Sequence, residues 1–137
     1  METQFEITRL QLLSPLYYSG GGDFDPFVYR EGDGEKLFCF DLGAAAGAFQ
    51  PDRAAFPGRL LFCGTAAGGG TADGELPPGN YLFAQQREVL SRESIITMVL
   101  EIQQEGLWQR LSLGSKLYLR YLFEDGCPVT QIFRPFT

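Results

Sequence analysis

The sequence predicts an α+β fold built mainly from antiparallel strands with one principal helix, and three observations support this. Several short segments alternate apolar with polar residues and end at Gly, Pro or Asp, which is typical of strands joined by turns. Only the segment from Ser91 to Gly106 repeats its apolar residues at helical spacing. Twelve Phe and six Tyr bring the aromatic content to 14%, so the chain can build a packed core.

The chain starts with a predicted strand followed by a predicted loop. Residues 5–13 do not hold helical spacing, and they predict a strand that ends before Pro15. Residues 19–23 include three consecutive glycines, which cost too much backbone entropy inside a regular element. We therefore expect a loop there.

A hairpin is predicted next. Residues 27–31 and 35–42 are rich in strand formers, and the glycines of Gly32-Asp33-Gly34 between them tolerate the positive φ of a tight turn. Residues 43–58 are rich in alanine and glycine and predict an irregular excursion with one short helical turn. A short buried strand is expected over residues 59–63.

A change in composition marks two halves, 1–70 and 76–137, of what we expect to be a single domain covering residues 1–137. A small, glycine-rich stretch ends at Pro77-Pro78-Gly79, which excludes a helix and favours an extended start for a strand over residues 80–86.

The principal helix is expected between Ser91 as N-cap and Gly106 as the residue just past its C-cap. Its apolar stripe consists of Ile95, Val99 and Ile102, widened by Met98. The β-branched run that begins at Ile95 lowers helix propensity, so a buried strand is the alternative.

Two strands are predicted to end the chain, over residues 116–124 and 129–136, because both segments alternate well. A turn over residues 125–128 separates them. The second half therefore reads strand, helix, strand, strand.

The net charge and the lack of long apolar segments restrict which classes of partner the protein can bind. Seventeen acidic against eleven basic residues give a net charge of -6, which repels nucleic-acid backbones and anionic lipids. No stretch is apolar enough for a membrane helix and none resembles a signal sequence. The three cysteines are odd in number and form no CxxC pair. We expect a cytoplasmic protein that binds neither nucleic acid nor membrane.

The residues that catalysis usually requires are missing. Histidine is absent, which removes the commonest general base and the commonest zinc ligand. Acidic residues around the first turns do not match a calcium-binding loop, and the triple glycine at 68–70 has no phosphate-binding lysine. We expect no metal and no cofactor, and an enzyme is less favoured than a binding protein.

Large amphipathic side chains are the best candidates for a binding site. The aromatic candidates are Tyr81, Trp108, Tyr118 and Tyr121, with Arg120 or Glu124 as the charged contact. Along residues 116–124, alternation sends Tyr118 and Arg120 to one face of the strand and Tyr121 to the other. The Tyr121 face is the more apolar and should be core, which makes Tyr118 and Arg120 the better ligand contacts.

Two motifs of the second half resemble gyrase-inhibitory-protein-like domains. They are Leu76-Pro77-Pro78-Gly79-Asn80-Tyr81-Leu82-Phe83 and Gln131-Ile132-Phe133-Arg134-Pro135-Phe136, which look like that family's signature strand and closing strand. The resemblance implies two strand-helix-strand-strand units around a cleft that takes small, often aromatic or cationic molecules, or a role in protein contact. The first half shows no clear helix, and the family's pocket glutamate has only Glu124 near its place. A cation preference is therefore not implied.

These observations favour non-catalytic binding of a small organic molecule in a cleft between the sheet and the helix. The alternative is a protein-interaction module, such as a homodimer that pairs exposed strand edges or covers its helix.

Overall fold

The computed structural model describes residues 4–20, 25–29, 34–42, 59–66 and 72–137. Eight strands and one helix lie within this part of the chain, which confirms an α+β fold dominated by antiparallel sheet. The elements are β1 (Thr8–Leu12), β2 (Leu16–Gly20), β3 (Lys36–Asp41), β4 (Arg59–Ala66), β5 (Gly74–Leu76), β6 (Gly79–Gln86), α1 (Arg92–Trp108), β7 (Lys116–Glu124) and β8 (Cys127–Pro135).

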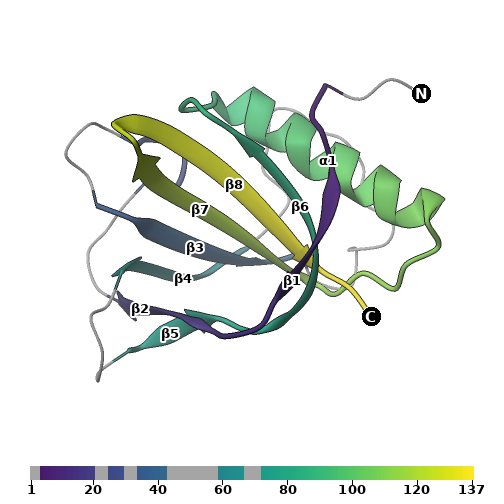
Figure 1. Cartoon of the computed structure of the whole chain (residues 1–137), viewed down its shortest axis with the longest axis horizontal. Coiled ribbons are helices and arrows are strands. Elements are labelled where there is room, and N and C mark those ends of the chain that lie inside the picture. Colours follow the sequence, from purple (N-terminus) through teal and green to yellow (C-terminus); the bar gives the residue numbers. More distant parts are fainter. Residues whose placement is uncertain (1–3, 21–24, 30–33, 43–58, 67–71) are drawn as a thin grey trace.

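All strands join one antiparallel sheet in the order β1-β6-β8-β7-β3-β4-β2-β5. β1 and β2 are one bent pass of the chain, interrupted at Pro15, and β5 and β6 are another, interrupted at Pro77 and Pro78. β1 pairs with β6, and β2 pairs with both β5 and β4. The first pass therefore pairs with strands near both ends of the strand order. The sheet is consequently strongly curled (Figure 1).

The two predicted halves both contribute strands to the sheet, with β6, β8 and β7 of the second half lying between β1 and β3 of the first. β3 pairs with β7, and β1 pairs with β6. The two parts of the sequence therefore share one sheet.

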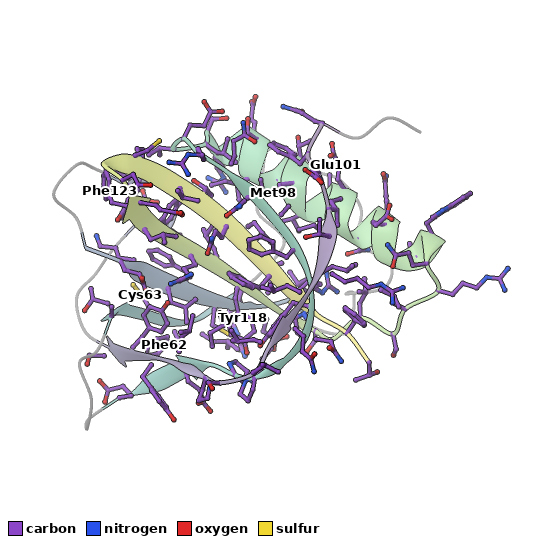
Figure 2. The ribbon with its side chains drawn as sticks, in the orientation of Figure 1. Phe62, Cys63, Met98, Glu101, Tyr118 and Phe123 are labelled. Atoms are coloured by element: carbon purple, nitrogen blue, oxygen red, sulfur yellow. The ribbon has the colours of Figure 1, made fainter. Side chains whose placement is uncertain are left out.

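The curled sheet carries an apolar cluster on each face. The helix-side core joins α1 to residues such as Leu82, Leu119 and Ile132, and α1 runs along β6 (Figure 1). The concave-side core contains residues from all eight strands, because the strands come together on the inside of the curl. Its members are Tyr18, Leu37, Cys39, Leu76, Tyr81, Tyr118 and Phe133, with Leu10, Leu12, Leu16, Phe62 and Phe83 at its margin. Figure 2 shows Phe62 and Tyr118 within the curl, away from Met98 on the helix.

The helix starts where the sequence predicts and ends later. Ser91 is the N-cap, and its hydroxyl accepts a hydrogen bond from the backbone N–H of Ser94 at 3.2 Å. Gly106 lies inside the helix, not beyond its end. The Leu113 side chain packs so closely against it that a Cβ at this position would lie 2.8 Å away, so glycine fits here best. The expectation that Gly106 ends the helix is therefore wrong, since the glycine serves a close contact.

The first half differs most from expectation. Residues 25–29 form no strand, and both edges of β3 are paired with β4 and β7, so the predicted hairpin of 27–31 with 35–42 is wrong. Residues 30–33 of that prediction lie outside the described residues. Of the loop predicted over residues 19–23, Ser19 and Gly20 lie in β2 and residues 21–23 lie outside the described residues. β4 is longer than residues 59–63, and its first three residues are exposed. The excursion at 43–58 lies outside the described residues. No helix of the described ranges is long and apolar enough to cross a membrane.

Candidate functional site

An aromatic row crosses the concave face of the sheet. Phe62, Cys39, Tyr118, Phe133 and Phe83 are successive cross-strand partners on β4, β3, β7, β8 and β6. Cys39, Tyr118 and Phe133 are buried, and the Phe83 and Phe133 ring centroids lie 4.9 Å apart. This row forms an apolar floor.

A polar row lies two residues further along the same strands. Arg120 on β7 pairs with Gln131 on β8, and Gln131 pairs with Gln85 on β6. Because side chains two residues apart in a strand point to the same face, this row stands beside the aromatic floor.

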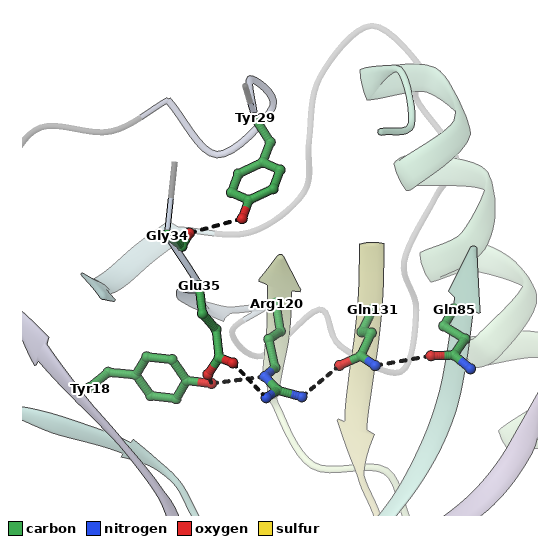
Figure 3. Close-up of polar contacts among 7 residues, drawn as sticks. All are labelled: Tyr18, Tyr29, Gly34, Glu35, Gln85, Arg120 and Gln131. Carbon is green, nitrogen blue, oxygen red and sulfur yellow. Dashed lines mark hydrogen bonds and ion pairs between the residues drawn. The ribbon is translucent and has the colours of Figure 1, made fainter. Parts of the chain in front are cut away.

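Five side chains form one hydrogen-bonded network along this row (Figure 3). The Arg120 guanidinium donates through Nε to Tyr18 Oη at 2.9 Å, through Nη1 to Gln131 Oε1 at 2.9 Å and through Nη2 to Glu35 Oε1 at 3.0 Å. Tyr18 Oη donates to Glu35 Oε2 at 2.7 Å. Gln131 Nε2 donates to Gln85 Oε1 at 3.0 Å. The network thus joins β2, the residue before β3, β7, β8 and β6.

The Glu35–Arg120 ion pair is the charged centre of this network. The side chain of Arg120 is 16% exposed and that of Glu35 is 27% exposed, so both are reachable from solvent although neither is free to move away. Burial raises the pKa of Tyr18, Arg120 partly opposes that rise, and the hydrogen bond to Glu35 adds to it. Tyr18 is therefore a neutral hydroxyl that accepts from Arg120 and donates to Glu35.

Arg120 retains unused donors. A guanidinium has five N–H groups, and three of them bond to Tyr18, Gln131 and Glu35. One N–H on each terminal nitrogen has no partner among the residues that the structure describes. Each oxygen of Glu35 takes one hydrogen bond from this network, which leaves it able to accept another. The pair can bind a group that both donates and accepts.

Tyr81 lies in the concave-side core beside Tyr118, which is itself part of the floor. The two rings meet edge to face at 6.2 Å, and Tyr81 Oη donates to the backbone oxygen of Pro77. Burial raises the pKa of Tyr81 to about 12 and that of Tyr118 further. Both side chains are buried, and the Tyr81 ring packs against the floor at Tyr118.

Tyr121 lies on the opposite face of β7, in the helix-side core, as the alternation of the strand predicts. Its ring stacks on Tyr29 with centroids 4.8 Å apart, and its hydroxyl donates to the backbone oxygen of Pro26 at 2.7 Å. It does not meet Arg120 or Tyr118 on the concave face.

Trp108 and Glu124 also lie away from the network. Trp108 is 83% exposed at the end of α1, which packs on the other face of the sheet. Glu124 is exposed at the end of β7, and its backbone oxygen accepts from Arg87 Nη2 at 3.4 Å. Of the six predicted residues, the structure groups Tyr81, Tyr118 and Arg120 on the concave face.

Four residues of the network were not identified from the sequence: Tyr18, Glu35, Gln85 and Gln131. Gln131 carried a usable signal, since it is a polar residue inside the apolar strand β8, whereas Gln85 is exposed beside Gln86 at the end of β6 and carried none. Glu35 lies beside a predicted turn, where solvated acids are common. Nothing in the local sequence of Tyr18 indicates its contact, because that contact depends on the curl of the sheet.

The described residues hold no group of three or more Cys, Asp or Glu side chains placed to bind a metal ion. Comparison of the chain with protein-family models and with curated proteins found no match.

Proposed function

We propose that the protein binds a small organic molecule, without catalysis, on the concave face of the sheet at the Glu35–Arg120 pair. The observation that carries this proposal is a charged, partly exposed pair with spare donors and acceptors, held beside an aromatic floor. Ligand sites combine apolar walls with a few fixed polar groups in this way.

The space between sheet and helix is a poorer place for a ligand. Ile95, Met98, Val99 and Ile102 of α1 are fully buried there against the sheet. A ligand in that space would have to displace packed core, whereas the Glu35–Arg120 pair on the opposite face is partly exposed, so we place the ligand at that pair.

The resemblance to gyrase-inhibitory-protein-like domains supports the same location. Its two motifs fall on the end of β5 with β6 and on β8, two passes that contribute Phe83, Gln85, Gln131 and Phe133 to the concave face. We assign the stretch from β6 through α1 and β7 to β8 to one strand-helix-strand-strand unit of that kind.

Replacing Arg120 with Met should weaken binding of any small molecule that uses this site by about tenfold or more, because hydrogen bonds to a charged group contribute about 1.5–3 kcal/mol. Ligands would be found by screening small planar compounds with two-dimensional NMR of the labelled protein. Arg87→Met is the control, since Arg87 is an exposed arginine outside the network.

Glu35→Gln keeps the shape of the pair, removes one charge and should also weaken binding. Thermal melts establish that each variant is folded at the titration temperature. Unchanged affinity in both Arg120→Met and Glu35→Gln would contradict the proposed site.

A second candidate function is homodimerisation through the end of α1. Leu107 is 58% exposed and Trp108 is 83% exposed, and they are adjacent. Arg9 Nε donates to Gln109 Oε1 at 2.7 Å, which fixes this corner against β1. Exposed tryptophan is the residue type most often found at the energetic centre of an interface.

Trp108→Ser should therefore turn a dimer into a monomer in sedimentation velocity runs at micromolar concentration. Leu13→Ser is the control, because Leu13 is equally exposed but lies at the bend between β1 and β2. A wild-type protein that sediments as a monomer at all concentrations would exclude this function.

A further inference from the structure

The Phe62 side chain occupies a socket made of glycine backbone. A Cβ added to Gly64 or Gly74 would lie 2.7 Å from the Phe62 ring, and one added to Gly20 would lie 3.2 Å from it. The three glycines come from β4, β5 and β2. The ring therefore lies directly on the main chain of three neighbouring strands, where any other residue type would intrude.

This socket adjoins the polar network. Gly20 pairs with Gly64, Gly64 pairs with Leu37, and Leu37 pairs with Arg120 across the sheet. Tyr18, which bonds to Arg120 and Glu35, is the cross-strand partner of Gly74. Both Phe62 and Tyr18 belong to the concave-side core. A planar molecule in the socket would thus have its edge toward Tyr18 and the ion pair.

Phe62 makes fewer ring contacts than the other aromatic residues of its row. It is only partly buried, whereas Tyr118 and Phe133 are buried. No ring contact links it to another described aromatic residue, whereas Phe133 contacts both Tyr81 and Phe83. On the side of the three glycines the ring meets main chain and no interlocking side chain, which favours its replacement by a ligand ring.

The charges at the socket's edge select the ligand. Glu35 and Arg120 neutralise each other at 3.0 Å and present spare acceptors and donors side by side. A charged ligand would add an uncompensated charge to this balanced pair in a partly dry site. A neutral group that donates and accepts, such as a carboxamide, satisfies both members.

We propose that the socket is the ring-binding subsite of the protein, held by Phe62 in the free state and taken over by an uncharged planar aromatic ligand with an amide-like edge. This rests on the proposed function, because it names the ligand class for that same site.

The test uses benzamide, benzoate and benzamidine, which share one shape and differ in charge. Phe62→Ala empties the socket, and we expect it to bind benzamide at least tenfold more tightly than the wild-type protein does. In that variant benzoate and benzamidine should bind at least tenfold more weakly than benzamide. Leu61→Ala is the control, since Leu61 is exposed on the same strand and should leave benzamide binding at the wild-type level.

Gly74→Ala provides the reciprocal test and does not depend on Phe62→Ala being folded. Its Cβ fills the socket, so benzamide binding should be lost even though the polar network is intact. Binding that persists in Gly74→Ala, or that is equal in Phe62→Ala and wild type, would overturn the ring subsite. Equal affinity for all three probes would overturn the charge selection.

The results that would contradict the proposed function differ from those that would contradict the ring subsite. If Arg120→Met and Glu35→Gln leave every ligand from the fragment screen bound as before, the polar pair is not a binding site. If those variants weaken a screened ligand while Phe62→Ala and Gly74→Ala do not alter its affinity, the pair binds ligand and the socket does not.

Discussion

Replacing Tyr121 with Ala should lower the free energy of unfolding by about 3–5 kcal/mol, the range for removing a large aromatic side chain from a core. The ring is fully buried, stacks on Tyr29 with an interplanar angle of 10°, and meets Phe38 edge to face at 6.1 Å. Urea unfolding monitored by circular dichroism measures the loss.

Tyr121→Phe separates the ring from its hydroxyl. It keeps the stacking and removes only the hydrogen bond to the Pro26 backbone oxygen, so a loss of about 1–2 kcal/mol is expected. If the Ala variant lost no more than the Phe variant, the ring would not be a core residue and the assignment of the two faces of β7 would be wrong.

Arg134→Ala should cost at least about 3 kcal/mol, because a large buried side chain is lost and its partners are left unbonded. Arg134 is fully buried on β8, where Nε donates to the Gly114 backbone oxygen at 2.8 Å and Nη1 to Gln103 Oε1 at 3.4 Å. Its Nη2 is buried with no hydrogen-bond partner. Burial lowers the pKa of Arg134 to about 10, the direction expected when a cation is desolvated.

Arg134→Met distinguishes the volume of this side chain from its charge. Methionine restores much of the apolar stem and removes the desolvated charge, and such replacements of buried ionic groups are often neutral or stabilising. We expect Arg134→Met to unfold within about 1 kcal/mol of the wild type in the same urea assay. Equal losses in the Ala and Met variants would mean that the guanidinium hydrogen bonds, not the packing, stabilise this site.

The elements predicted correctly from sequence are those with a clear local period. The strand over residues 116–124 and the helix start at Ser91 depend on alternation and capping, which neighbouring residues determine. The predicted hairpin failed because β3 takes its partners from β4 and β7, far away in the chain. Tyr29, which was expected in a strand, stacks on Tyr121 instead.

Glycine was the least predictable residue type. Gly20 and Gly74 look like breakers in the sequence, yet both are paired in strands and the Phe62 ring packs against them. The same long-range curl explains the candidate site. Alternation predicts that Tyr118 and Arg120 share a face, but the meeting of Arg120 with Tyr18 and Glu35 requires distant strands to bend round to β7.

The first chain pass, β1 and β2, pairs with β6 and β5, and this arrangement has a consequence for local stability. The seam between β2 and β5 has only three paired positions, whereas β7 and β8 are paired over seven. Short ladders open at a lower free energy than long central ones, so amide protons at the seam should exchange with solvent well before those of β7 and β8. Gly74 belongs to the seam and also touches the Phe62 ring. A brief separation of β2 from β5 would therefore uncover that ring while the rest of the sheet stays folded.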